Sequence, residues 1–239
     1  MPNPAQEAFR AGQGLVKQNP VLGPLIERAV LCFDDSYPMA REDWAWVASD
    51  GYIYANSHRR ALPGEWAYVL AHCLLHLALG HIREDREGDS LWNAACDCVT
   101  ARYLADLHIG TPPRELADPL PSNTREEEKL YFWLKEHKDP ACFHFSTMSG
   151  SRADMSWRGE TRHWWSGATD WRKLFAESLR DALRAAVDYA GGVRTEPGKY
   201  KKMGPVKRAQ EWFLSSYPLL GGVASGFKLV DDPLTVQRM

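Results

Sequence analysis

The stretch from Pro63 to Gly80 constrains the fold more than any other part of the chain. Proline is tolerated at the first position of a helix and glycine is common just past the last, so these two residues predict the ends of a helix. The intervening sequence, EWAYVLAHCLLHLAL, is apolar nearly all round, whereas a surface helix has a polar face. We therefore expect this helix to be buried.

Two histidines, His72 and His76, interrupt this apolar helix. Residues four positions apart lie on one face of a helix, one turn from each other, so both imidazoles can reach a single Zn²⁺ ion. A buried imidazole needs a hydrogen-bond partner or a metal, and neutral imidazole is a common metal ligand. The pair therefore favours a metal site. The alternative is a pair of core histidines satisfied by backbone carbonyls or by a carboxylate.

A third ligand must come from elsewhere, and the sequence offers two candidates. Asp97 is favoured because its neighbours on a helix are small, which permits close packing against the first helix and burial of the carboxylate. A buried carboxylate is costly unless it is paired or bound to a metal. The other candidate is His81, just past Gly80, which can instead be a solvated residue whose charge suits the end of the helix.

The segments around this helix predict a mostly helical α+β fold with a small hairpin or sheet packed on it. Aromatic and β-branched residues flank the turn Asp50-Gly51 within residues 43–57, which predicts a hairpin with Tyr52 to Asn56 as its second strand. Periodicity leaves residues 20–34 open between a helix and a buried strand. Further helices are expected at 91–107 after a Ser90 cap, from the capping box Thr124-x-x-Glu127 to 136, and at 170–189, with a loop over 138–168.

The chain divides into three parts by composition. Residues 1–192 are expected to form the main domain, and residues 193–207 read as a basic linker punctuated by glycine and proline. Residues 208–239 resemble residues 10–34 at a constant offset, which is either the start of a second copy of the fold or a chance similarity of two unrelated helices.

Composition excludes several classes of protein. The formal net charge is −2, whereas nucleic-acid binders usually carry a basic excess. No apolar run reaches the roughly 18 residues of a membrane span, and the polar N-terminus lacks the apolar core of a signal peptide. The five cysteines fit no disulfide framework. We expect a cytoplasmic protein without a nucleic-acid or membrane partner; the oligomeric state is left open.

Several segments together resemble a known family. The sequence VLAHCLLHLALGH, residues 69–81, resembles the helix Val-Leu-Ala-His-Glu-x-x-His of the metallopeptidase-like domain that bacteria often place in front of a von Willebrand factor A-like domain. WNAACDCVTARYL, residues 92–104, looks like the Trp-Asn-x-Ala-x-Asp helix of that family. TREEEKLYFWL and TDWRKLF are similar to two of its later segments. The resemblance covers roughly residues 20–190.

The resemblance implies a zincin-like core, zinc as the cofactor, His72 and His76 as ligands and Asp97 as the third. It also implies that the strand carrying Tyr52 and Tyr54 lies beside the metal-binding helix as an edge strand, where it could pair with an extended substrate. Two departures stand out. Cys73 occupies the position of the family's glutamate, which activates the zinc-bound water in zincins, and the von Willebrand-like domain is absent from this sequence.

Three functions follow as hypotheses. The first is a degenerate metallopeptidase that binds zinc and serves as a scaffold or peptide-binding module, because Cys73 is a poor substitute for a carboxylate base. The second is an active zinc peptidase that uses another base, such as Asp97 or Glu65. The third is a structural or interaction protein without a metal. The first is preferred, with a peptide or another protein as the expected partner.

Overall fold

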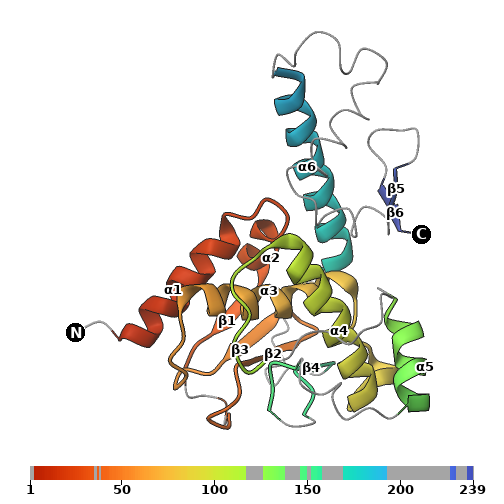
Figure 1. Cartoon of the computed structure of the whole chain (residues 1–239). Coiled ribbons are helices and arrows are strands. Elements are labelled where there is room, and N and C mark those ends of the chain that lie inside the picture. The colour runs from red at the N-terminus through yellow and green to blue at the C-terminus, as the bar shows by residue number, and fades with distance from the viewer. Residues whose placement is uncertain are drawn as a thin grey trace.

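The computed structural model describes residues 3–34, 37, 39–116, 126–137, 146–149, 152–157, 169–192, 227–229 and 236–238. Within these residues the chain forms a mostly helical α+β fold with six α-helices and a small four-stranded mixed sheet that contacts helix α3 (Figure 1). In chain order the elements are α1 (Pro4–Lys17), α2 (Gly23–Arg28), β1 (Val30–Cys32), β2 (Ala45–Ala48), β3 (Tyr52–Ala55), α3 (Pro63–Leu79), the 3₁₀ turn η1 (Glu84–Arg86), α4 (Ser90–Leu107), α5 (Glu127–His137), β4 (Met155–Ser156), α6 (Trp171–Gly192), β5 (Phe227–Leu229) and β6 (Val236–Arg238).

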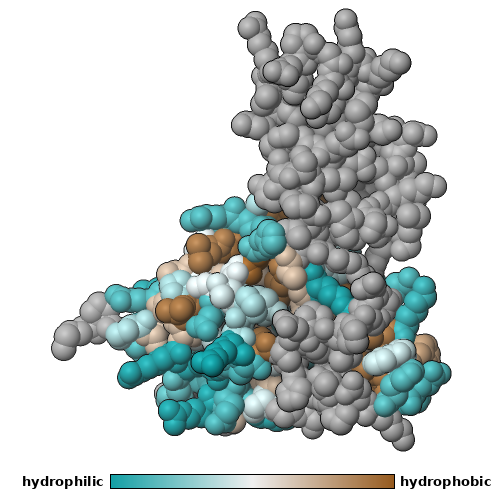
Figure 2. All heavy atoms as spheres, viewed as in Figure 1, coloured by the Kyte–Doolittle hydropathy of each residue, from teal (hydrophilic) through white to brown (hydrophobic). Residues whose placement is uncertain are grey.

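Helix α3 is the centre of the fold, as its sequence predicts. Every residue from Trp66 to Leu79 is buried, and α1, α4, α6 and β2 all pack against the helix. Gly80 ends it in the left-handed conformation with φ 70°, which glycine adopts at little cost. The coloured surface in Figure 2 is largely hydrophilic, with apolar residues in small separate groups. Burial of α3 therefore accounts for its apolar character on all sides.

The sheet has the strand order β1-β3-β2-β4. Strands β2 and β3 pair antiparallel with Trp46 opposite Tyr54, which confirms the predicted hairpin. Strands β1 and β4 add on its two sides, both parallel to their neighbours. Residues 20–34, which periodicity left undecided, contain both a short helix, α2, and the strand β1.

The expectation that the strand carrying Tyr52 and Tyr54 is an edge strand was wrong. Strand β3, which carries Tyr52 and Tyr54, lies between β1 and β2 and not at an edge. Leu31 of β1 pairs with Ile53 on the side that the hairpin alone would have left open. Because the backbone of β3 is paired on both sides, it cannot bind an extended substrate by adding a strand there.

The remaining boundaries differ from prediction in small ways. Helix α4 is capped by Asp89 and not by Ser90, since Asp89 Oδ1 accepts hydrogen bonds from the backbone N–H groups of Leu91 and Trp92, each at 3.1 Å. Helix α6 begins and ends close to its predicted bounds, whereas Thr124 of the predicted capping box lies outside the described residues. The stretch 138–168, expected as a loop, contains the short strand β4.

The linker at 193–207 and most of the segment 208–239 lie outside the described residues. Strands β5 and β6 form a separate antiparallel pair in that segment. Among the described helices, none has the length and apolar character required to cross a membrane.

Candidate metal centre

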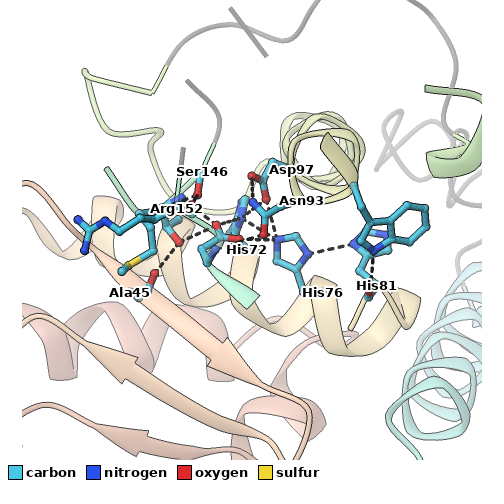
Figure 3. A network of polar contacts seen from close by, with 12 residues as sticks. Ala45, His72, His76, His81, Asn93, Asp97, Ser146 and Arg152 are labelled. Atoms are coloured by element: carbon cyan, nitrogen blue, oxygen red, sulfur yellow. Dashed lines mark hydrogen bonds and ion pairs between the residues drawn. The ribbon is translucent and has the colours of Figure 1, made fainter. Parts of the chain in front are cut away.

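Helix α3 presents two imidazoles to one point in the core. His72 and His76 are both fully buried, and their Nε2 atoms lie 2.9 Å apart. Asp97, on the neighbouring helix α4, is also fully buried, and its Oδ1 lies 3.4 Å from His72 Nε2 and 3.1 Å from His76 Nε2. Helices α3 and α4 pack against each other, and the small residues Ala94 and Ala101 of α4 are buried. The structure therefore brings the two histidines and the preferred third ligand together (Figure 3).

A fourth donor, Asp154, was not predicted from the sequence. It directly precedes β4 and is fully buried, with Oδ2 3.0 Å from His72 Nε2 and Oδ1 3.7 Å from His76 Nε2. Pairing of β4 with β2 brings it to the cluster, because Val47 N donates to Asp154 O at 2.8 Å. Residues 138–168 show no periodicity, so the sequence carried no local signal for a buried carboxylate at this position.

The spacing of the four donors fits one metal ion. Their ligand atoms all lie within 4.8 Å of one another. A tetrahedral zinc ion with bonds of about 2.0–2.1 Å holds its ligand atoms about 3.4 Å apart. The four separations between the histidine nitrogens and their carboxylate partners run from 3.0 to 3.7 Å and bracket this value. The two Nε2 atoms are closer, 2.9 Å apart, so the four donors approach a tetrahedral arrangement and need only small side-chain shifts to hold one ion.

Two oxygens of the cluster are suited to bind a cation. Asp97 Oδ1 and Asp154 Oδ1 are buried and accept no hydrogen bond from the described residues. Each nevertheless faces a histidine nitrogen within 4 Å. Two carboxylates side by side in a core are costly unless positive charge compensates them. The cluster is therefore better explained as a binding site for a divalent cation than as a pair of neutral histidines in the core.

The electrostatics of the cluster show the same need for positive charge. Burial alone would lower the pKa of His72, but its hydrogen bond to Asp154 and its contact with the Asp97 carboxylate raise that pKa to about 9. Burial and the neighbouring charge of Asp154 raise the pKa of Asp97 above its usual value. Burial opposes ionisation of Asp154 too, yet its contacts with the two histidines hold its pKa well below the usual range. The contacts of Asp154 with the two histidines therefore favour its ionised form.

Outer residues hold both carboxylates in place. Asn93 Nδ2 donates to Asp97 Oδ2 at 2.6 Å, and Asn93 Oδ1 accepts from the backbone N–H of Asp154 at 3.2 Å. Thr147 N donates to Asp154 Oδ2 at 2.8 Å, and Thr147 Oγ1 lies 2.9 Å from the same oxygen. Partners of this kind orient metal ligands and tune their affinity. Asn93 links the two carboxylates directly, so their positions are coupled.

His81, the other candidate for the third ligand, lies on the opposite side of the His76 ring. It is fully buried, and its Nδ1 is 3.0 Å from His76 Nδ1. The four converging donors do not include it. Its carbonyl oxygen accepts a hydrogen bond from Trp92 Nε1 at 2.8 Å. His81 is therefore neither a solvated residue past the helix end nor a member of the donor cluster.

Neither Cys73, at the position of the family's glutamate, nor Glu65, one of the two alternative bases, is suited to act as a base in this structure. Burial, then the charges of Asp154 and Asp97, raise the pKa of the Cys73 thiol well above its usual value, so the thiol stays protonated at neutral pH. Glu65 is engaged at the start of α3, where its Oε2 accepts from Leu62 N at 2.7 Å. Seven residues of helix place it about 10 Å along the axis from His72. Tyr52 and Tyr54, expected to contact a substrate, both lie on the interior strand β3.

Comparison of the chain with family models, with curated proteins and with solved structures finds no match.

One pocket borders the cluster. It has a volume of about 480 Å³ and is lined in part by His76, Gly80, Arg83, Trp157 and Arg172. Arg172 Nη2 donates to the Gly80 carbonyl at 3.2 Å, so α6 packs over the end of α3 on this side. The pocket touches the cluster only through His76, since the other three donors do not line it.

Proposed function

We propose that the chain is a zincin-like metal-binding protein, a degenerate metallopeptidase that holds one zinc ion and does not hydrolyse peptides. The observation that carries this proposal is the convergence of four fully buried donors, His72, His76, Asp97 and Asp154, within 4.8 Å of one another. The resemblance of residues 69–81 and 92–104 to the metallopeptidase-like family supports the same assignment for the first three.

The donor set favours zinc. Two imidazole nitrogens and two carboxylate oxygens are ligands that zinc accepts, and zinc in proteins usually takes four ligands in a tetrahedron. Mg²⁺ and Ca²⁺ prefer more ligands, nearly all of them oxygen. Other first-row metals also accept imidazole, so the identity of the bound ion is tested directly below.

The number of ligands argues against hydrolysis. Structural zinc sites are closed by four protein ligands, whereas catalytic sites have three and leave a position for water or substrate. Asp154 supplies the fourth ligand here, and all four donors are fully buried. Cys73 adds a second obstacle, because a buried thiol with a raised pKa does not remove a proton from water. A scaffold or peptide-binding role follows for such a module.

One observation favours the second candidate, an active zinc peptidase. The pocket beside the cluster is lined by His76, so solvent could approach one ligand from that side. An active enzyme would then need Asp97 or Asp154 to leave the ion and act as a base. The two candidates make opposite predictions for peptide cleavage by the wild-type protein.

The test measures metal content and cleavage on the same purified chain. We expect about one zinc per chain by mass spectrometry, lost in His76→Ala, with no chelator-sensitive cleavage of a peptide library. His137→Ala is the matched control, because His137 is an exposed histidine on α5 outside the donor cluster. Absence of metal from protein purified without chelator would contradict the proposal. Cleavage abolished by His76→Ala would establish the peptidase instead.

A further inference from the structure

The ring of His76 lies between two sets of contacts. On one side its Nε2 faces the donors, 2.9 Å from His72 Nε2 and 3.1 Å from Asp97 Oδ1. On the other side its Nδ1 lies 3.0 Å from Nδ1 of His81 (Figure 3). Of the two ring nitrogens of His76, one therefore belongs to the metal centre and the other contacts His81.

The backbone fixes His81 in this position. Gly80, with φ 70°, turns the chain at the end of α3 so that His81 N donates to His76 O at 3.0 Å. The carbonyl of His81 accepts from Trp92 Nε1 at 2.8 Å. Both backbone polar groups are thus held by residues of α3 and α4, and the side chain is fully buried against His76.

The contact between the two Nδ1 atoms restricts where the proton of His76 resides. Two nitrogens 3.0 Å apart must share one proton, since two protonated nitrogens would clash and two bare ones would repel. A neutral imidazole offers a lone pair at Nε2 only when its proton is on Nδ1. The His76 tautomer that can bind an ion is therefore the one in which His76 Nδ1–H donates to His81 Nδ1.

We propose that His81 is a positioning residue of the metal centre: its Nδ1 accepts the His76 Nδ1–H hydrogen bond and thereby presents His76 Nε2 to the ion. The inference rests on the proposed metal-binding function and adds a role for a residue outside the donor set. Metal-bound histidines commonly donate their second N–H to such an acceptor, most often a carboxylate, a carbonyl or water. Here the acceptor is a second histidine, held by the turn at Gly80.

The experiment compares substitutions that differ in the acceptor they offer. Asparagine at position 81 places an amide oxygen where histidine has Nδ1, whereas leucine has the same branching and no acceptor. Glutamine carries its oxygen one bond farther out and is the polar control. The readouts are zinc affinity, by competition with a chromophoric chelator, and the visible absorption of the Co²⁺-substituted protein. Thermal stability of each variant in excess chelator reports the metal-free fold.

We expect His81→Leu and His81→Gln to bind zinc about 10- to 100-fold more weakly than the wild type. His81→Asn should retain affinity of the wild-type order and the wild-type Co²⁺ spectrum. If His81→Leu does not fold, the contrast between the two amides still decides the matter. Equal affinity in all variants would overturn the inference, and so would equal loss in Asn and Gln. A wild-type protein that binds no metal would instead overturn the proposed function, and this inference with it.

Discussion

His72 and Asp154 are 82 positions apart in the chain, yet His72 Nε2 lies 3.0 Å from Asp154 Oδ2. Both side chains are fully buried. The contact depends on the parallel pairing of β4 with β2, which sets Asp154 at the end of a strand beside α3. It raises the number of donors that converge at the candidate site from three to four. Four protein ligands would close a zinc site, whereas three would leave a position for substrate.

Asp154→Asn tests the fourth ligand. The substitution keeps the volume of the side chain but removes the negative charge and replaces one acceptor oxygen with an NH2 group. Zinc affinity should therefore fall by about 100-fold or more, since losing an outer partner alone costs about 10- to 100-fold. Chelator competition measures the affinity. Asp85→Asn is the control, because Asp85 is exposed and contacts only arginines near η1. Unchanged zinc affinity in Asp154→Asn would show that three ligands suffice.

Cys73→Ala tests whether the thiol takes part in the site. Cys73 is fully buried in the core and is not among the converging donors. The variant should keep about one zinc per chain and lose about 1 kcal/mol of unfolding free energy, as is typical of a small buried truncation. Metal analysis and urea denaturation check both expectations. Loss of zinc from Cys73→Ala would place the sulfur at the ion.

Cys73→Glu places a carboxylate where the resembling family has one. The new charge would lie in the core near Asp97 and Asp154, whose charges already raise the pKa of the thiol. We expect the metal-free variant to lose about 3 kcal/mol or more of stability, since a buried charge without a partner is strongly destabilising. Urea denaturation in chelator measures the loss. Zinc-dependent peptide cleavage by this variant would contradict a closed site.

Two glycine substitutions should have opposite effects on stability. Gly80 has φ 70° and an added Cβ would collide with the side chain of Arg172. Gly80→Ala should therefore cost about 1–2 kcal/mol from the left-handed backbone alone. Gly14 lies within helix α1 with nothing within 4 Å of an added Cβ, so Gly14→Ala should stabilise by up to about 1 kcal/mol. Thermal unfolding of both variants and the wild type, run side by side, tests the contrast in sign.

Asp43 should make stability depend on acid pH. Burial raises the pKa of this carboxyl, but hydrogen bonds from Ser149, Arg152 and the N–H of Ala40 outweigh it and hold the pKa below its usual value. A carboxyl with a lowered folded pKa stabilises the fold above its unfolded pKa of about 3.9, and this contribution disappears as the pH falls through the folded value.

Asp43→Asn isolates this contribution from that of the other acidic groups. At pH 7 it should cost about 1.5–3 kcal/mol, the range for hydrogen bonds to a charged group. The difference from wild type should shrink as the pH falls below about 4. Urea denaturation between pH 7 and pH 3 measures it. A difference that stays constant with pH would show that the charge of Asp43 does not matter.

The parts of the fold that sequence predicted are those with a strong local pattern. Helix α3 was recognisable from its proline and glycine ends, and the hairpin from the turn at Asp50-Gly51. The spacing of His72 and His76 sets their relative position within one helix, since the helix itself fixes which residues share a face. Asp97 was found because small neighbours on its helix are a local sign of close packing.

The parts that sequence missed depend on contacts between distant segments. The assignment of an edge to β3 failed because β1, in a stretch of ambiguous periodicity, pairs with its open side. His81 could be read as a solvated residue or a ligand, because nothing local shows that Gly80 turns it back toward His76. Asp154 lies in a segment without periodicity, and pairing of β4 with β2 brings it to the cluster.

The sequence by itself determined a buried helix with two imidazoles on one face and a nearby carboxylate, because helix geometry and hydrophobic patterning act over a few residues. The tertiary structure alone decided how many donors converge at the candidate site and which groups orient them. The number of donors and the groups that orient them depend on strand pairing and on the close approach of segments far apart in the chain. Packing of the whole core sets these contacts, and no periodic pattern in the sequence indicates them.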